Sequence, residues 1–341
     1  MRDARRTGHR VLQAFVAAAA GIGMVLQGVP AGAQQPAPPR AGLVWIIGLH
    51  SLQRLRAVPG SQALIRTFFS AGRYSILVGG AHGSVPALHA KRSPAFGSYQ
   101  TLKVALARRL PDGSGTRLVI LDLEHWSLTP RIEQRHPARY YRLAFRTAKR
   151  KGFLLLATPS ANLVRARSSP SVPGFTAFLR SGLIGRVART AAIVEVQAQG
   201  FERSTSLYRQ FVQDAADQAR DANPHVAVIA GLSTNPGGRG VPAAQLRRDA
   251  LAVRPYVDGF WLNIPRRSRA CPRCGVARPD IAAGLLVELM RDRAFLPGAA
   301  PGQPKAPSGP DDAHPTHISH VRAVGSQDVR VAAGAWDRWT Y

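Results

Sequence analysis

Two carboxyl groups stand at the end of one apolar run in the middle of the chain. Residues 117–124 (RLVILDLE) are almost wholly apolar until Asp122 and Glu124. Residues i and i+2 of a β-strand point to the same face, so we expect both carboxyl groups on one side, about 6–7 Å apart along the strand. Two such groups cannot both ionise freely, so the pKa of one rises and that group can act as a general acid. The alternative is that arginine side chains neutralise the pair.

A second run combines apolar and long polar side chains. Glu195, Gln197 and Gln199 alternate with small apolar residues in 191–199. Burying such polar groups without partners is costly, so they must bind something. A sugar, which is dense in hydroxyl groups, is one such partner, and an internal hydrogen-bond network is the other. Glu195 is therefore the candidate for a second catalytic carboxyl group.

Aromatic and amide side chains near other strand ends complete the candidate site. Trp261 and Asn263 share one face of residues 257–264, where the indole predicts a platform for a sugar ring. A core position for Trp261 is the alternative. The other candidates for substrate contacts lie just after apolar runs and are Trp126, Asn235 and His82.

The elements that must position these residues alternate along the chain. The candidate strands are 43–49, 75–80, 117–124, 152–158, 191–199, 225–232 and 257–264, and helical stretches lie at 99–109, 139–151, 204–221, 243–253 and 280–294. Alternating strands and helices predict a parallel sheet with right-handed crossovers. The fold class is α/β, a (β/α)8-type TIM barrel whose active site lies at the C-terminal ends of the strands.

An eighth strand is needed to close this barrel. Residues 62–69 (QALIRTFF) are the candidate, as an incomplete or irregular second strand. An open doubly wound sheet is the alternative architecture. The chain lacks the GxGxxG and GxxxxGK[ST] phosphate-binding patterns in the required positions and the GxSxG nucleophile elbow, so the nucleotide-binding and α/β-hydrolase versions are disfavoured. We expect no cofactor.

The N-terminal residues 1–33 have the pattern of a secretory signal peptide. A basic head precedes the apolar run 11–26, and Ala31-Gly32-Ala33 resembles a cleavage site, so Gln34 is the expected new terminus. A membrane anchor is the alternative, although the run is short for a span. We expect a protein that is secreted or attached to the cell envelope, without a membrane span after processing. The pattern leaves the export route open.

The remaining segments frame one domain. Residues 34–41 are a predicted leader, 42–294 the barrel, 295–312 a linker and 313–341 a C-terminal tail. Histidines and aspartates in the linker and tail suggest a weak metal site, but a proline among them disfavours it, so no metal site is expected. These residues are Asp311, Asp312, His314, His317 and His320.

The charge of the chain is strongly positive. The formal net charge is +27, with 46 Lys and Arg against 19 Asp and Glu. Such a charge favours polyanionic partners, and we expect anionic cell-envelope polymers. The cations are mostly arginines spread over the predicted helices, without a basic block interleaved with aromatic residues, so nucleic-acid binding is not expected.

Cys271 and Cys274 are the only cysteines, in the sequence Cys-Pro-Arg-Cys. Outside the cytoplasm this spacing favours a disulfide across a small loop. A redox-active pair is the alternative, and a zinc site would need further ligands.

Taken together, these motifs resemble family 18 glycoside hydrolases, the chitinase-like barrels. Gly79-Gly80 matches the family's Ser-x-Gly-Gly strand end, Asp122-Leu123-Glu124 matches the end of its DxxDxDxE strand, and Trp261 matches its terminal tryptophan. The resemblance implies that Glu124 is the proton donor and Asp122 the assisting aspartate. Arg117 and Ile120 stand where the family has further aspartates, and no counterpart of its substrate-binding tyrosine is evident on 191–199.

The function expected from these features is an exported glycoside hydrolase-like barrel. It would act on an envelope or environmental polysaccharide or oligosaccharide by general acid catalysis. Two alternatives remain open at this point, a non-catalytic carbohydrate-binding barrel and a structural protein of the cell envelope.

Overall fold

The computed structural model describes residues 42–79, 88–108, 117–165, 174–268 and 271–300. In these ranges the strands form one parallel sheet in the order β3-β2-β1-β9-β8-β7-β6-β5-β4. Their bounds are β1 Val44–Gly48, β2 Gly72–Val78, β3 Ala90–Ser93, β4 Ala95–Phe96, β5 Leu118–Leu121, β6 Leu154–Ala157, β7 Ile193–Val196, β8 Ala227–Ser233 and β9 Gly259–Asn263.

The sheet closes on itself through a strand that is divided at Pro94. The two ends of the strand order, β3 and β4, are consecutive in sequence and are separated by this one residue. On one side Gly79 N–H donates to Ser93 O over 3.3 Å, and on the other side Ile120 N–H donates to Pro94 O over 2.9 Å. Since β3 and β4 occupy one position, nine strands make a ring of eight positions. The predicted (β/α)8-type barrel is therefore confirmed.

The predicted eighth strand at 62–69 is wrong, because this segment is the helix α2 (Ser61–Phe69). Its buried side chains Leu64, Ile65 and Phe68 follow the spacing of one helix face. The missing strand is formed by residues 90–96 (AKRSPAF), a run with two cations and a proline. The irregular strand was predicted at the second position of the ring, but the divided strand β3–β4 occupies the third position. The second strand, β2, is regular except for a shift of its register against β3 between Gly72 and Ile76.

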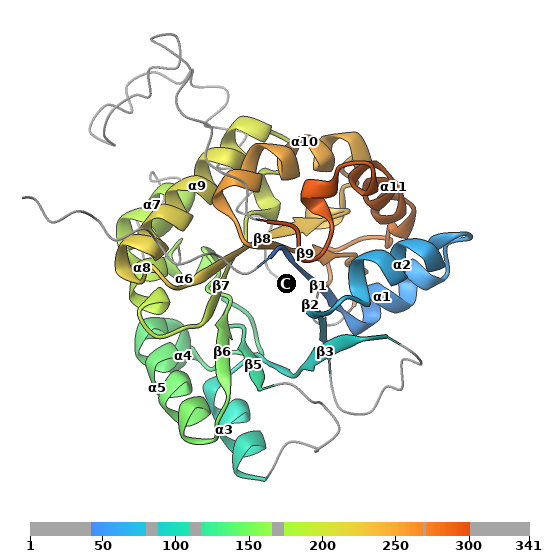
Figure 1. Cartoon of the computed structure of the whole chain (residues 1–341). Helices are drawn as coiled ribbons and strands as arrows, with labels where there is room; N and C mark the ends of the chain where they lie inside the picture. Colours follow the sequence, from blue (N-terminus) through green and yellow to red (C-terminus); the bar gives the residue numbers. More distant parts are fainter. Residues whose placement is uncertain (1–41, 80–87, 109–116, 166–173, 269–270, 301–341) are drawn as a thin grey trace, which may run out of the picture. The chain divides into compact units, whose positions relative to one another are not determined.

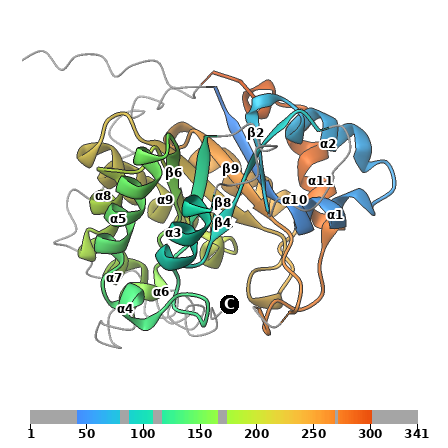
Figure 2. The same ribbon diagram turned by 90° about the horizontal axis from the view of Figure 1, so that it is seen from below.

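Helices surround the ring on the outside (Figure 1). Figure 2 shows α5 and α8 on one side of the strands and α1, α2 and α11 on the other. The helix bounds are α1 Leu49–Arg56, α2 Ser61–Phe69, α3 Tyr99–Ala107, α4 Arg131–Arg135, α5 Pro137–Arg150, α6 Asn162–Arg165, α7 Gly174–Ser181, α8 Leu183–Ala188, α9 Thr205–Ala222, α10 Ala243–Val253 and α11 Pro279–Met290. Short 3-10 helices lie at η2 Gln199–Phe201, η3 Pro236–Gly238, η4 Arg254–Tyr256 and η5 Arg293–Phe295.

The alternation of side chains along the strands separates two cores. One lies between the ring and the helices and contains, for example, Trp45, Phe260 and Leu262. The other fills the inside of the ring and consists of Ile46, Ile76, Val78, Leu118, Ile120, Leu156, Ile229 and Trp261. The interior is thus apolar at mid-height, and burying each of these side chains contributes about 1.5–3 kcal/mol. Polar residues then occupy the same inward positions nearer the C-terminal ends of the strands.

The folded barrel continues past the predicted boundary at residue 294. Trp45 Nε1–H donates to Phe295 O over 2.8 Å, and Phe295 is fully buried. Leu43 N–H donates to Ala299 O and Gly298 N–H to Leu43 O, over 2.8 and 2.9 Å. Residues 295–300 therefore cover the end of the barrel where the strands begin, and a linker can start only beyond them.

Several predicted features lie outside the described residues. These are the signal peptide 1–33, the leader 34–41, His82 and the tail 313–341. Among the helices that the structure describes, none has the length and apolar character needed to cross a membrane.

Candidate active site

A pocket of about 150 Å³ opens at the C-terminal ends of the strands. It brings together eight of the site residues predicted from sequence, from β5, β7 and β9 and the segments that follow them. These are Asp122, Glu124, Trp126, Glu195, Gln197, Gln199, Trp261 and Asn263. The wall is completed by Ser51, Ser233, Pro236, Gly237, Pro265, Cys271, Arg273 and Cys274.

Asp122 follows β5 directly and is half-buried in the pocket. Its Oδ1 accepts hydrogen bonds from Thr158 Oγ1 over 2.6 Å and from Gln197 Nε2 over 3.2 Å. Burial raises the pKa of Asp122 to about 6, although both hydrogen bonds favour the charged form. These two donors stabilise the negative charge of Asp122.

Glu124 lies two residues further on and is almost completely buried. Its Oε2 accepts a hydrogen bond from Asn162 Nδ2 over 3.4 Å, and Asn162 Oδ1 accepts one from His125 N–H over 2.8 Å. Burial and then the nearby charge of Asp122 raise the pKa of Glu124 well above its usual value. The charge of Asp122 therefore favours the protonated form of Glu124.

Glu195 sits on β7 in the same pocket and is equally buried. Its Oε1 accepts one long hydrogen bond, of 3.5 Å, from Gln199 Nε2. Burial, followed by the charge of Asp122, raises the pKa of Glu195 well above its usual value. The two side chains lie over Gly231 of β8, where a Cβ atom would come within 2.9 Å of Glu195 Oε1 and 2.7 Å of Gln199 Cδ.

The structure does not neutralise these carboxyl groups with arginines. Within the described residues, Asp122, Glu124 and Glu195 form no ion pair, and no cation contributes to the shift of any of their pKa values. The alternative of an arginine-neutralised pair is therefore wrong for this part of the chain. Burial without a paired cation raises the pKa of all three carboxyl groups, and the charge of Asp122 raises those of Glu124 and Glu195 further, which suits acid–base chemistry.

Trp261 faces the inside of the ring, while its neighbours Phe260 and Leu262 face the helices. The indole is 8% exposed, and its Nε1–H is buried without a hydrogen-bond partner among the described residues. Buried indole N–H groups normally have an acceptor. Trp261 thus lines the pocket with its ring, while its indole N–H is buried without an acceptor among the described residues.

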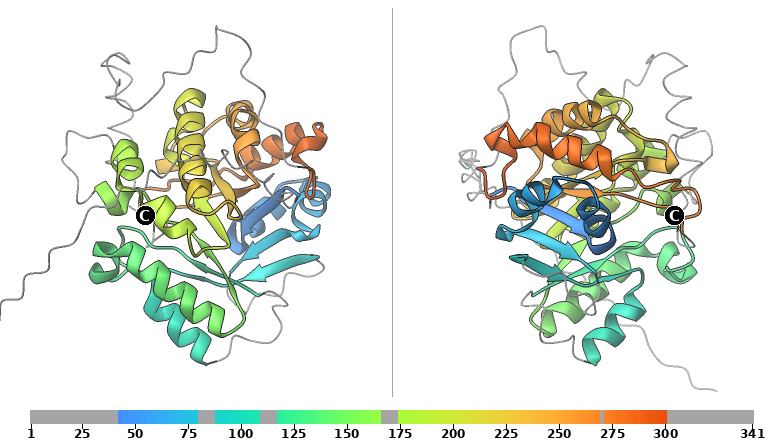
Figure 3. Two further views of the ribbon diagram at one scale, coloured as in Figure 1. Left: turned by 60° about the vertical axis from the view of Figure 1, so that its left-hand side comes forward. Right: turned by 90° about the vertical axis from the view of Figure 1, so that its right-hand side faces the viewer.

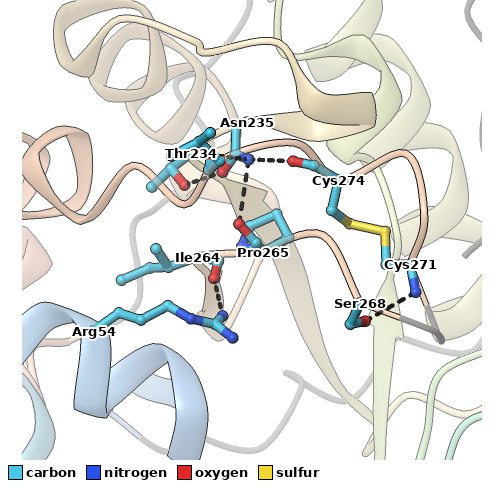
Figure 4. Close-up of a disulfide and its surroundings, with 9 residues drawn as sticks. Arg54, Thr234, Asn235, Ile264, Pro265, Ser268, Cys271 and Cys274 are labelled. Atoms are coloured by element: carbon cyan, nitrogen blue, oxygen red, sulfur yellow. Dashed lines mark hydrogen bonds between the residues drawn. A yellow bond between two sulfur atoms is a disulfide. The ribbon is translucent and has the colours of Figure 1, made fainter.

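Asn235 supports the wall of the pocket instead of lining it. It is fully buried, and its Nδ2 donates to Cys274 O, Val276 O and Pro265 O over 2.7, 3.0 and 3.2 Å (Figure 4). These acceptors belong to the loop that connects β9 to α11. The predicted role of Asn235 as a sugar contact has no geometric counterpart in this arrangement.

The same loop carries the disulfide between Cys271 and Cys274, with Cα atoms 5.4 Å apart (Figure 4). Both cysteines line the pocket, as does Arg273 between them. The short bridge therefore shapes the pocket wall, which the position of the cysteines in the sequence did not indicate.

The sequence patterns did not single out two supporting residues, Thr158 and Asn162. Both follow the strand β6, at the same end of the ring as Asp122 and Glu124. Their position just after an apolar run is the signal that could have identified them. They hold the two carboxyl groups, and Tyr141 OH adds a further contact by accepting from Leu123 N–H over 3.2 Å.

In the described residues no three His, Cys, Asp or Glu side chains are arranged to hold a metal ion. The polar groups of the pocket are instead carboxyl, amide and hydroxyl groups, with the guanidinium of Arg273 in the wall. This donor and acceptor set matches a ligand that is rich in hydroxyl groups.

Comparisons with known proteins assign the chain to no family. No protein-family model matches the chain, and no curated protein matches it. The resemblance to family 18 therefore stays an expectation that rests on short motifs.

Solved structures share the barrel architecture at low similarity. The catalytic domain of a hyperthermophilic chitinase from Pyrococcus furiosus is 11% identical, with a TM-score of 0.42, over 76% of this chain and 98% of that chain. A sugar phosphate isomerase/epimerase from Parabacteroides distasonis has the same identity and TM-score, over 76% and 99%. A beta-glucosidase is 12% identical, with a TM-score of 0.34, over 57% of this chain and only 64% of its own length. Likenesses this weak assign no activity, and those proteins differ in activity among themselves.

Proposed function

We propose that this protein is a glycoside hydrolase that cleaves a polysaccharide or oligosaccharide by general acid catalysis. One observation carries the proposal. Asp122 and Glu124 share a pocket at the C-terminal ends of the barrel strands, where burial and then the charge of Asp122 raise the pKa of Glu124. Pairs of carboxyl groups with separated pKa values are the acid–base machinery of glycosidases.

In this proposal Glu124 protonates the glycosidic oxygen of the leaving group. Burial and then the charge of Asp122 raise its pKa, which favours the protonated form that a general acid needs. Asp122, ionised above about pH 6, then faces the positive charge that develops at the sugar carbon. Glu195 is the second carboxyl group of the proposal, and burial, followed by the charge of Asp122, raises its pKa.

The remaining pocket residues supply the sugar contacts. Trp261 offers an apolar ring, and Gln197, Gln199 and Asn263 offer amides. Trp126 closes one wall, held by the hydrogen bond from its Nε1–H to Thr129 Oγ1 over 2.7 Å.

The test is an assay of the purified protein against α- and β-linked polysaccharides and oligosaccharides, with chitin and cell-wall glycans included. Release of reducing ends that disappears in Glu124→Gln supports the proposal. Binding without release by the wild-type protein contradicts it.

A non-catalytic carbohydrate-binding barrel is the second candidate. The observation that favours it is that the polar side chains partly satisfy one another, since Asp122 accepts from Thr158 and Gln197, and Glu195 from Gln199. Such a network can hold a sugar without cleaving it. In the same assay this candidate predicts binding of wild-type and Glu124→Gln protein with equal affinity and no product from either.

We also propose that the protein is exported and acts in the cell envelope or outside the cell. The basic head, apolar run and cleavage-like site of residues 1–33 support this, as does the spacing of the cysteines. N-terminal sequencing of the exported protein should give a terminus at or near Gln34. A membrane-bound protein that retains residues 1–33 would contradict the proposal.

A further inference from the structure

The segment of α4 and α5 holds an unusual concentration of positive charge. Residues 131–151 contain eight Lys and Arg and one acid, Glu133, whereas the whole chain has 46 cations in 341 residues. Glu133 is buried, and its carboxylate accepts from the backbone N–H groups of Tyr99 and Gln100 over 2.7 and 3.3 Å. The segment therefore presents no acid to solvent that could balance its exposed cations.

Four of these cations form a line along α5. Arg139, Arg142, Arg146 and Arg150 are spaced by three, four and four residues, so they share one face of the helix. All four are exposed. At 1.5 Å per residue this line, named here the α5 row, is about 16 Å long.

The opposite face of α5 is fully occupied by the protein itself. Tyr141, Ala144 and Ala148 are buried there, in the core between the helices and the ring. Figure 3 shows α5, in green, on the outer side of the barrel beside α3. The row thus faces away from the protein, and like charges one turn apart destabilise a helix unless anions lie near them.

We propose that the α5 row binds a linear anionic polysaccharide, at a surface separate from the pocket. A straight row with one guanidinium per turn fits a polymer that repeats one anionic group per unit. Guanidinium groups pair with carboxylate, sulfate or phosphate groups through two parallel hydrogen bonds, and such pairs are stronger than neutral ones. The proposal does not depend on the chemistry of the pocket.

The chemistry of α5 favours a glycan over the other polyanions. Single-stranded nucleic acids are bound by exposed aromatic rings that stack on bases, and the aromatic residues of α5 next to the row, Tyr140 and Phe145, are half-buried. Anionic membranes are bound by helices that insert an apolar face. The large exposed apolar residues of the described chain, such as Val104 and Leu154, do not lie on α5, and its apolar face is in the core.

The experiment measures binding of polygalacturonate to the full chain at several salt concentrations, with uncharged dextran as the blank. The row variant replaces three arginines of the row by glutamine, which keeps the length and polarity of the side chain. A control variant removes the same charge from exposed arginines of α7, α8 and the residue after α8. The changes are Arg139→Gln, Arg142→Gln and Arg146→Gln in the first, and Arg180→Gln, Arg186→Gln and Arg189→Gln in the second.

We expect the row variant to lose at least tenfold in affinity, and the control less than threefold. Each lost ionic contact lowers the slope of log affinity against log salt by about 0.7–0.9, by the rule measured for nucleic acids, so three contacts lower it by about 2–3. Circular dichroism should show both variants folded. Because the readout is binding, an inactive pocket leaves the result unaffected.

Three results would overturn the proposal. Equal loss in both variants would show that diffuse charge binds the polymer. If the wild-type protein does not bind polygalacturonate, the α5 row does not bind a linear anionic polysaccharide. Tighter binding of single-stranded DNA or anionic vesicles, dependent on the row, would assign the row to a different class of partner.

Discussion

Asn162 connects Glu124 to the backbone of the next residue. Its Nδ2 donates to Oε2 of Glu124 over 3.4 Å, while its Oδ1 accepts from His125 N–H over 2.8 Å. The amide is therefore held in one orientation, with its donor directed at the carboxyl group. Glu124 can accept this bond at Oε2 and still carry its proton on the other oxygen. This arrangement orients the proposed acid without forcing its ionisation.

Replacement of Glu124 by glutamine should abolish most turnover. Gln keeps the size of the side chain but cannot deliver a proton, and general acid catalysis typically contributes about 10²–10⁴-fold. We expect kcat to fall by about that factor with little change in the dissociation constant of the sugar, measured by calorimetry. Glu288→Gln on α11, a partly exposed glutamate outside the pocket, is the matched control. An active Glu124→Gln protein would remove Glu124 from the proposed role.

Replacement of Asp122 by asparagine should move the alkaline limb of the pH profile to lower pH. The charge of Asp122 raises the pKa of Glu124, so without it Glu124 loses its proton at a lower pH. The acidic limb near pH 6, set by the ionisation of Asp122, should disappear. The measurement is kcat/KM between pH 4 and 9. If the alkaline limb stays in place, the two carboxyl groups do not interact as argued.

A methyl group on Gly231 should damage the site while sparing the fold. In Gly231→Ala the added Cβ would meet the ends of Glu195 and Gln199, which are side chains able to move aside. Overpacking of this kind costs about 1–3 kcal/mol of unfolding free energy, and the displaced carboxyl group should weaken sugar binding. Gly48→Ala is the control, since its Cβ would meet only Ser51 Oγ at 3.9 Å. Equal binding by both variants would show that Glu195 does not contribute.

Replacement of Asp249 by asparagine should stabilise the protein at neutral pH. Asp249 is buried beside Glu202, and burial raises the pKa of Asp249 to about 6 and the pKa of Glu202 well above its usual value. Because the pKa of Asp249 is raised, the folded state binds more protons than the unfolded state between about pH 4 and 6. The contribution of Asp249 to the unfolding free energy therefore falls over this range and is lost above it. A shift of about two pKa units corresponds to about 2–3 kcal/mol.

The check is the melting temperature of wild type and Asp249→Asn between pH 4 and 8. We expect nearly equal values at pH 4 and a higher value for the variant at pH 8. Asn retains an oxygen for the bonds from Thr205 Oγ1 and Gln245 Nε2, of 2.6 and 2.9 Å. A variant that is less stable at every pH would show that the negative charge is needed there.

The loop that carries the disulfide should depend on Asn235 more than on the bridge. A bridge across so short a loop removes little entropy from the unfolded chain, so Cys271→Ser with Cys274→Ser should cost about 2 kcal/mol or less. Asn235→Ala instead leaves the carbonyls of Pro265, Cys274 and Val276 without their donor. We expect sugar binding to survive the first change and to be lost in the second, with both measured by calorimetry. Loss of sugar binding in the cysteine variant but not in Asn235→Ala would show that the disulfide, and not Asn235, holds the pocket wall.

Strands in which apolar and polar residues alternate, or in which apolar residues are continuous, could be predicted from the sequence. The polar residues that follow these strands could be predicted as well. Residues 117–124 show why, because each inward position there is apolar at mid-height and acidic at the end. The strand at 90–96 could not be found in this way. Lys91, Arg92 and Pro94 interrupt any apolar pattern in this segment. Each half of the strand pairs with only one neighbouring strand, so the ring position is defined by partners that are distant in sequence.

The roles of single side chains were less accessible. Asn235 follows a strand, as a ligand-binding residue would, yet its amide nitrogen donates to a loop that begins about 30 residues later, and its amide oxygen accepts from Thr234. The effect of Asp122 on Glu195 likewise depends on how β5 and β7 meet across the ring. Spacing along a strand identifies the face of a residue, but only the closed ring determines its neighbours.

The divided strand at Pro94 has a dynamic consequence for the pocket. Proline has no N–H to donate, and β4 is only two residues long, so few hydrogen bonds join this part of the ring to β5. Native proteins open first where backbone hydrogen bonds are few. One of those few bonds runs from Asp122 N–H to Phe96 O over 2.9 Å. Transient opening of the ring at this seam would therefore release the backbone of Asp122, one of the carboxyl groups proposed to carry the chemistry.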